Sequence, residues 1–293
     1  MSEWTRSDEQ VRQSVRERYA TAARSSLMVA ETGCCGGASC CGARDDAASG
    51  DPVTTGNYDE ADTPFTAALA ASLGCGNPTA LAELRPGEDV LDLGSGGGLD
   101  VLLSARRVGP EGTAYGLDMT PEMLDLAERH RAEAGVENAR FLRGTIEDVP
   151  LPADAVDVII SNCVINLSPD KDAVIAESFR VLRPGGRFAV SDIVLLSDLP
   201  EALKEITALW TGCVSGSLRD QEFVAKLQAA GFLEASVEVT RRYERADLAA
   251  LAEELGDEQL PEGMTRAEVV DALDGAFASA FIRATKPTAG GPE

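Results

Sequence analysis

Short apolar runs alternate with segments of helical periodicity through the middle of this chain. Such runs are typical of parallel strands buried on both faces of a sheet, and the segments between them are typical of covering helices. The pattern predicts strands at 90–93, 113–117, 139–142, 156–160 and 187–190, and helices at 99–108, 121–134 and 172–182. This alternation predicts an α/β fold with a parallel sheet wrapped on both faces.

Further elements are predicted on either side of this core. Helical spacing occurs at 8–30, 63–73, 200–210, 220–230 and over most of the acidic segment 246–275, and strands are predicted at 235–240 and 277–284. We therefore divide the chain into an N-terminal helix and cysteine-bearing arm (1–62), a ligand-binding core (63–198) and a C-terminal region of helices and closing strands (199–293). Residues 31–57 carry no apolar period and are predicted to form a mobile loop.

The first strand of the core ends in a turn that has almost no side chains. Residues 89–98 read DVLDLGSGGG, and a strand that ends in glycines and opens a helix lets a ligand lie against backbone amides. The dinucleotide fingerprint needs a glycine where this chain has Leu99, so the pattern here is G-x-G-x-G. Asp92 precedes the first glycine by two residues, where a carboxylate faces the ligand and favours a cation over a pyrophosphate.

A second acid follows the second strand. Asp118 stands at the end of the 113–117 run, where nucleotide-binding α/β folds place a carboxylate that accepts hydrogen bonds from ribose hydroxyls. Met119, next to it, is expected to pack on an adenine face. The alternative interpretation of Asp118 is a solvated acid that caps the following helix.

Composition restricts the partners and the compartment. The 293 residues are 44% hydrophobic and 26% charged, and the net charge of −23 argues against nucleic acid and anionic membranes, which carry the same sign. The chain lacks an apolar run of about 20 residues and the apolar core of a signal peptide, so a cytoplasmic location is expected. Its single histidine, His130, falls on the polar side of a helix and is expected at the surface.

The seven cysteines fall into two groups. Two adjacent pairs, 34–35 and 40–41, lie in the predicted loop and are either incidental thiols or a gated soft-metal or redox site. Cys75, Cys163 and Cys213 lie in loops of small residues rather than on apolar helix faces. In a reducing compartment, soft-ion ligands, redox thiols or buried apolar residues are expected more often than structural disulfides. Together the three cysteines would form a soft trigonal site beside the ligand cleft.

Several motifs in this chain resemble those of the arsenite S-adenosylmethionine methyltransferases, a family of class I methyltransferases. The matching segments are GCGNP around Cys75, VLDLGSGGGLD, GLDMTPEML, SNCVINLSPDK around Cys163, VLRPGGRFAVSD, and LWTGCVSGSL around Cys213. The resemblance implies a doubly wound, mostly parallel, seven-stranded Rossmann-like sheet that binds S-adenosylmethionine. Its implied cofactor contacts are Asp92, Gly94, Ser95, Gly96, Gly98, Asp118, Met119, Ile146, Glu147 and Asn162.

The resemblance also implies roles for the cysteines. Cys75, Cys163 and Cys213 would hold trivalent arsenic, whose lone pair attacks the cofactor's methyl group without a general base. A further N-terminal cysteine, for which we favour Cys34 or Cys35, would take part in thiol exchange. Methylation oxidises arsenic, and its return to the trivalent state would convert two thiols to a disulfide that a reductant such as thioredoxin or glutathione resets. The implied partners are arsenite, methylated arsenicals and that reductant.

Two other functions remain open from the residues alone. A C- or O-methyltransferase acting on a small organic molecule would share the glycine turn and Asp118, but it would give no reason for three cysteines in loops of small residues. A non-catalytic thiol protein that binds metalloids would explain those cysteines but not the predicted cofactor site. Methyl transfer to arsenite, compared with transfer to organic acceptors, separates these hypotheses.

Overall fold

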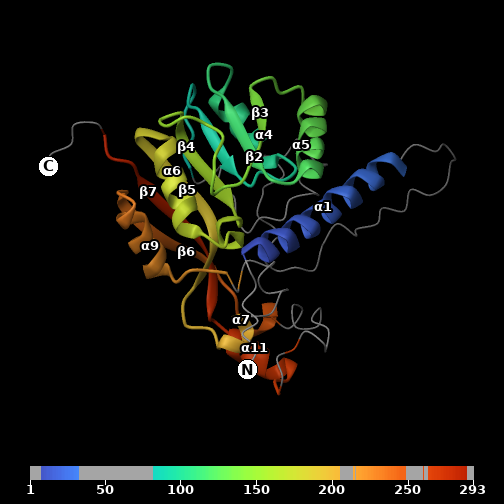
Figure 1. Ribbon diagram of the computed structural model, residues 1–293, viewed down its shortest axis with the longest axis vertical. Coiled ribbons are helices and arrows are strands. Elements are labelled where there is room, and N and C mark those ends of the chain that lie inside the picture. Colours follow the sequence, from blue (N-terminus) through green and yellow to red (C-terminus); the bar gives the residue numbers. More distant parts are fainter. Residues whose placement is uncertain are drawn as a thin grey trace.

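The computed structural model describes residues 8–32, 82–204, 214, 216–248, 260 and 263–288. These residues form one seven-stranded sheet in the order β3-β2-β1-β4-β5-β7-β6 (Figure 1). The strands are β1 (Val90–Leu93), β2 (Ala114–Asp118), β3 (Ala139–Arg143), β4 (Val156–Asn162), β5 (Leu182–Leu195), β6 (Leu233–Arg242) and β7 (Phe277–Thr285). Strands β1 to β5 run parallel, and β7 is antiparallel to both of its neighbours. The predicted seven-stranded, mostly parallel sheet is confirmed.

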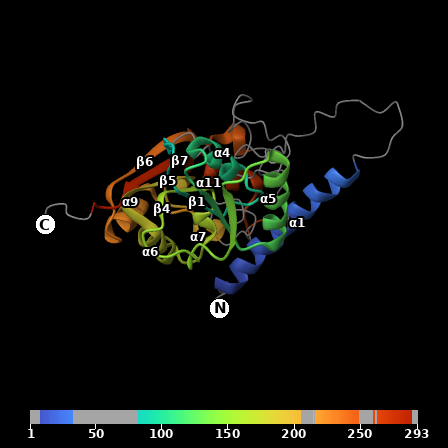
Figure 2. The ribbon, with the colours of Figure 1, turned by 90° about the horizontal axis from the view of Figure 1, so that it is seen from above.

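Helices cover both faces of this sheet. They are α1 (Asp8–Thr32), α4 (Leu99–Val108), α5 (Pro121–Ala134), the 3-10 helix η1 (Ile165–Leu167), α6 (Lys171–Val181), α7 (Glu201–Lys204), α9 (Asp220–Ala229) and α11 (Arg266–Leu273). The chain leaves β1 and β4 in opposite directions along the sheet. Consequently α4 and α5 lie on one face and α6 and α9 on the other, with α1 alongside α5 (Figure 2).

The strand register brings three functional segments to one edge of the sheet. Leu93 of β1 pairs with Leu117 of β2 on one side and with Ser161 of β4 on the other. The residues that follow these strands therefore emerge together at the carboxyl edge, where the strand order reverses between β1 and β4. Ligands of open α/β sheets bind at such a switch point.

Strands β4 and β5 differ from the sequence prediction in ways that affect the site. Strand β4 continues to Asn162, two residues beyond the predicted end, so Cys163 follows the strand directly. Strand β5 begins at Leu182 and includes the Pro-Gly-Gly segment, which we expected to separate helix from strand. The reason is pairing, because the N–H of Gly185 donates to the carbonyl oxygen of Lys286 at 2.9 Å and the N–H of Lys286 donates to Gly186 at 2.9 Å. The predicted helix at 63–73 lies outside the described residues, as does the predicted loop from residue 33 onward.

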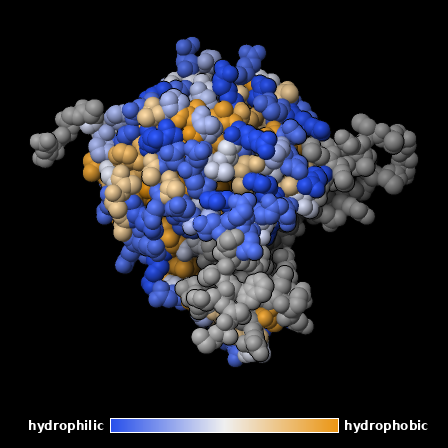
Figure 3. Space-filling model, viewed as in Figure 1, coloured by the Kyte–Doolittle hydropathy of each residue, from blue (hydrophilic) through white to orange (hydrophobic). Residues whose placement is uncertain are grey.

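The surface agrees with the charged composition. The face shown in Figure 3 is largely hydrophilic over the described residues. The large apolar side chains that are exposed, Leu233 and Val239, both lie on the edge strand β6. Among the described residues, no helix is both long and apolar enough to cross a membrane.

Candidate active site

The glycine turn after β1 is shaped by close backbone approaches. Gly94 donates its N–H to the carbonyl oxygen of Leu117 at 2.8 Å and has a left-handed backbone with φ of 73°. A Cβ atom at Gly94 would come within 2.4 Å of Val164, and one at Gly98 within 2.8 Å of Phe141. Glycine is therefore required at both positions, and the turn presents bare backbone at the start of α4.

Asp118 organises this turn from the end of β2. Its carboxylate accepts hydrogen bonds from the N–H of Gly96 at 2.9 Å and from the N–H of Thr120 at 2.8 Å. Burial raises the pKa of Asp118, and these backbone donors partly oppose that rise. The side chain is half-buried and reaches the cavity described below, so it is not the solvated acid of the alternative interpretation.

Two further carboxylates lie close to Asp118. Asp92 is only 2% exposed, and its Oδ1 has no hydrogen-bond partner among the described residues. Burial raises the pKa of Asp92 well above its ordinary value, and the charges of Asp100 and Asp118 raise it further. Asp100 accepts a hydrogen bond of 3.3 Å from the side-chain amide of Asn162. This concentration of buried negative charge favours a cationic ligand.

A cavity opens at this edge of the sheet. Its walls come from the glycine turn, the end of β2, residues 144–147 after β3, Val164 and residues 167–169 after β4, and α1. Of the cofactor residues inferred from sequence, Gly94, Gly96, Asp118, Met119, Ile146 and Glu147 line it, whereas Asp92, Ser95, Gly98 and Asn162 belong to the adjoining strand ends and turn.

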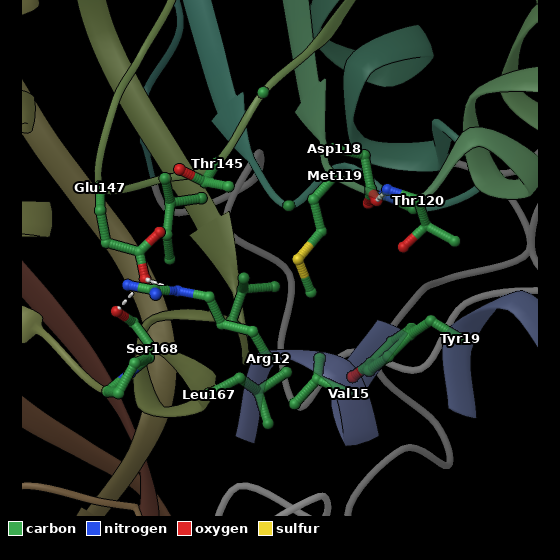
Figure 4. Close-up of a pocket in the computed structure, with 16 residues that line it drawn as sticks. Arg12, Val15, Tyr19, Asp118, Met119, Thr120, Thr145, Glu147, Leu167 and Ser168 are labelled. Atoms are coloured by element: carbon green, nitrogen blue, oxygen red, sulfur yellow. Dashed lines mark hydrogen bonds and ion pairs between the residues drawn. The ribbon is translucent and has the colours of Figure 1, made fainter. Parts of the chain in front are cut away.

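Helix α1 supplies a wall that the sequence analysis did not assign to the site. Arg12, Val15 and Tyr19 project from successive turns towards the cavity (Figure 4). The Arg12 guanidinium pairs with the Glu147 carboxylate at 3.7 Å, and Glu147 also accepts a hydrogen bond of 2.5 Å from the Ser168 hydroxyl. The spacing of Val15 and Tyr19 was visible as a helical stripe, but a stripe of that kind predicts packing and not a ligand wall.

Cys163 lies next to this cavity, between the end of β4 and the lining residue Val164. It is 3% exposed and has a left-handed backbone with φ of 58°, which is uncommon for a residue with a side chain. Its N–H donates to the carbonyl oxygen of Ser191 at 2.8 Å, which fixes it to β5. Cys163 is disulfide-bonded, whereas a free thiol was expected for this position. A disulfide requires a second cysteine sulfur within bonding distance.

Cys34, Cys35, Cys75 and Cys213 all lie outside the described residues. Among the described residues, no three His, Cys, Asp or Glu side chains are grouped as metal ligands would be. The trigonal arrangement of Cys75, Cys163 and Cys213 therefore stays a prediction.

The expected surface position of His130 is wrong. His130 is 7% exposed, and its Nδ1 lies 2.8 Å from the carbonyl oxygen of Gly97. The helical pattern of α5 predicted that this polar residue would face water. It faces inward because its hydrogen-bond partner lies in the glycine turn, 33 residues earlier. The His130 side chain therefore stabilises the glycine turn.

Comparisons with known proteins place this chain in a family. A family model described as a methyltransferase domain matches residues 84–231. The structure also resembles that of an arsenic(III) S-adenosylmethionine methyltransferase from Chlamydomonas reinhardtii. The TM-score is 0.57 and the sequences are 32% identical, over 80% of this chain and 73% of that one. The chain belongs to the arsenite S-adenosylmethionine methyltransferase family.

Curated members of this family match over most of the chain. The arsenite methyltransferase of Halobacterium salinarum is 42% identical over 236 residues, which are 78% of this chain. The arsenite methyltransferase of Aquipseudomonas alcaligenes is 38% identical over 208 residues, or 69% of this chain. The matched regions cover 58% and 59% of the lengths of these two relatives.

The described residues fit the cofactor from which the family takes its name. S-adenosylmethionine carries a sulfonium and an ammonium group, and the carboxylates of Asp92, Asp100 and Asp118 provide negative charge around the turn where such cations would lie. The unpartnered Oδ1 of Asp92 is an acceptor that a cationic N–H donor would satisfy. The cavity is lined by Asp118 and by Ile146 and Glu147, the residues expected to contact the ribose and the adenine.

Proposed function

We propose that this protein transfers a methyl group from S-adenosylmethionine to trivalent arsenic held by cysteine thiolates, as a step in arsenic detoxification. The observation that carries this proposal is the position of Cys163. It is buried at the carboxyl edge of the sheet, next to the lining residue Val164. Membership of the family and a soft ligand at this edge favour arsenic over an organic acceptor.

The cofactor would be held by its charges and its ribose. When bound, it supplies a methyl group on a positively charged sulfur, which the lone pair of trivalent arsenic can attack. Asp118 would accept hydrogen bonds from the ribose hydroxyls, and Asp92 would face the cationic amino-acid end. Gly94, Ser95, Gly96 and Gly98 would leave space for that end against the backbone. Met119, Ile146 and Glu147 would enclose the adenine, next to the α1 residues Arg12 and Tyr19. Asn162, through Asp100, would support this acidic cluster.

The arsenic would be held by thiolates from separate parts of the chain. We assign this role to Cys163, Cys75 and Cys213. Trivalent arsenic keeps its lone pair when it is bound to thiolates, so no residue has to remove a proton from the nucleophile. This agrees with the engagement of the single histidine in a hydrogen bond to Gly97. The protein then has to align the arsenic with the methyl group, and such alignment contributes strongly to the rate of a transfer reaction.

A redox step would restore the trivalent state after each transfer. Methylation raises arsenic to the pentavalent state. Two thiols would then return two electrons and be oxidised to one disulfide, for which we favour Cys34 or Cys35 as a participant. A thiol reductant such as thioredoxin or glutathione would reduce that disulfide, and the cytoplasm would provide it. The disulfide at Cys163 would also have to be reduced before arsenic binds, because the thiolate is the ligand.

The direct test is methyl transfer from labelled S-adenosylmethionine by the full chain in the presence of a thiol reductant. Arsenite is compared with a panel of phenolic and quinone-precursor acceptors, and products are identified by mass. The proposal expects methylated arsenicals as the labelled products. Labelled organic products without methylated arsenic would favour the C- or O-methyltransferase alternative. Stoichiometric arsenite binding without any transfer would favour a metalloid-binding protein.

A further inference from the structure

A buried hydrogen-bond network surrounds Asn166, three residues after Cys163. Asn166 lies in η1 and is fully buried. Its side-chain Nδ2 donates to Oδ1 of Asp192 at 2.8 Å and to the carbonyl oxygen of Ile193 at 2.6 Å. Its backbone N–H donates to Oδ2 of Asp192 at 3.2 Å. Two bonds from the side chain and one from the backbone thus attach the Cys163 loop to β5.

The same amide reaches a second segment of the chain. Nδ2 of Asn166 lies 3.1 Å from the hydroxyl oxygen of Ser217, which is 9% exposed. The segment that carries Ser217 is itself bonded to the end of β5, since the N–H of Leu195 donates to the carbonyl oxygen of Leu218 at 2.9 Å. In the sequence, Ser217 follows Cys213 by four residues. Asn166 therefore joins the Cys163 loop to the segment that comes after Cys213.

The orientation of the Asn166 amide is costly to maintain. Its Oδ1 is buried and has no hydrogen-bond partner among the described residues, which costs about 1–3 kcal/mol. A flipped amide would set that oxygen against the carbonyl oxygen of Ile193, which only accepts, so the orientation is fixed. Nδ2 has two hydrogens, so its longer contact with Ser217 shares a hydrogen with one of the two shorter bonds. Lys171 adds a nearby positive charge, because its Nζ donates to the carbonyl oxygen of Ser168 at 2.8 Å.

We infer that Asn166 and Ser217 are positioning residues that set the separation between the Cys163 loop and the segment following Cys213. This inference rests on the proposed function, because it gives the network the task of presenting thiolates to one arsenic atom. A soft ion bound by several thiolates needs sulfur atoms at fixed separations, and neighbouring residues that hold the ligand loops determine those separations. Neither residue touches the cofactor cavity, so its effect should be confined to arsenic.

The test is Ser217→Ala in the full chain, reduced before measurement. This change removes the acceptor on one segment and leaves the bonds from Asn166 to Asp192 and Ile193 in place. Arsenite alone is titrated calorimetrically, then S-adenosylmethionine, and KM and kcat are measured for each. We expect arsenite affinity to fall about tenfold and its KM to rise by a similar factor, with cofactor affinity within twofold of the wild-type value.

Ser178→Ala is the matched control. Its hydroxyl donates to the carbonyl oxygen of Val174 at 2.8 Å within α6, so the change also removes one buried hydrogen bond, but outside the network. The control should leave arsenite affinity unchanged. The loss caused by Ser217→Ala should be smaller in an Asn166→Ala background than in the wild type, because the bond between these two side chains is already gone there.

The results separate this inference from the proposed function. Wild-type arsenite affinity in Ser217→Ala would overturn the positioning role, as would an equal loss of arsenite and cofactor affinity. A wild-type protein that neither binds nor methylates arsenite would instead refute the proposed function on which the inference depends.

Discussion

The imidazole of His130 donates a hydrogen bond from Nδ1 to the carbonyl oxygen of Gly97 across 2.8 Å. A carbonyl oxygen only accepts, so Nδ1 carries the proton. The bond joins the buried face of α5 to the glycine turn that precedes α4. The single histidine of the chain therefore lies beneath the glycine turn. In this position it supports the shape of the turn and does not act as a base.

Removing this bond should weaken cofactor binding. We expect His130→Ala to lower S-adenosylmethionine affinity by about tenfold, in line with the loss of one buried hydrogen bond and the exposure of an unpaired carbonyl. The affinity is measured by calorimetry. Glu133→Ala, at an exposed position on the same helix, is the control and should bind the cofactor normally. Equal affinity in His130→Ala and the wild type would show that the turn keeps its shape without the bond.

Replacing Asp118 should weaken cofactor binding more than replacing His130, because the Asp118 carboxylate has two roles. Its carboxylate holds the N–H groups of Gly96 and Thr120, and in the proposed function it also binds the ribose. Asp118→Ala is expected to weaken cofactor binding by a few kcal/mol while leaving arsenite binding largely intact. Separate calorimetric titrations with cofactor and with arsenite test this. Unchanged cofactor affinity would refute the ribose assignment.

The pH dependence of stability should depend on Asp192. Burial raises the pKa of Asp192 to about 7 in the folded protein. The folded state therefore keeps this proton over a range where the unfolded chain has lost it. The free energy of unfolding should consequently decrease as pH rises from about 4 to about 7, by on the order of 4 kcal/mol from this group.

Asp192→Asn cannot ionise and should remove that contribution. Urea unfolding between pH 4 and pH 8 is expected to show a shallower decline for Asp192→Asn than for the wild type. Glu111→Gln, which changes an exposed carboxyl, is the control. The same slope in all three proteins would mean that Asp192 is ionised across the whole range.

Elements that depend on local pattern were predictable from the sequence. Helices α4 and α5 begin and end at the predicted residues, because Gly98 and Pro121 define their starts and Gly109 and Gly135 their ends. The strands of the core were found because apolar runs buried on both faces leave little ambiguity.

Contacts between residues far apart in sequence were not predictable. His130 faces inward because of a carbonyl group on another segment, and Asn166 is buried because Asp192, 26 residues later, accepts its hydrogen bonds. Likewise, the α1 stripe carrying Tyr19 forms a cavity wall only because α1 packs alongside α5. The pattern of apolar and polar residues along the chain does not predict these pairings.

Variants of the arsenic-binding cysteines and of the redox cysteines should differ in the substrate that they still methylate. We predict that Cys75→Ser, and Cys34→Ser combined with Cys35→Ser, lose arsenite methylation but retain methylation of monomethylarsenite, which needs one thiol fewer. Each variant is given both substrates and the products are followed by mass. Equal losses on both substrates for every cysteine would mean that binding and redox thiols are not distinct.

The central claim is that thiolates, including that of Cys163, hold the arsenic during transfer. A serine hydroxyl is a hard and mostly protonated ligand, so it cannot replace a thiolate on a soft ion. The decisive measurement is methylation of arsenite by Cys163→Ser, with cofactor affinity determined on the same preparation. We predict normal cofactor affinity and no methylated arsenic. Wild-type methylation of arsenite by Cys163→Ser would contradict the account.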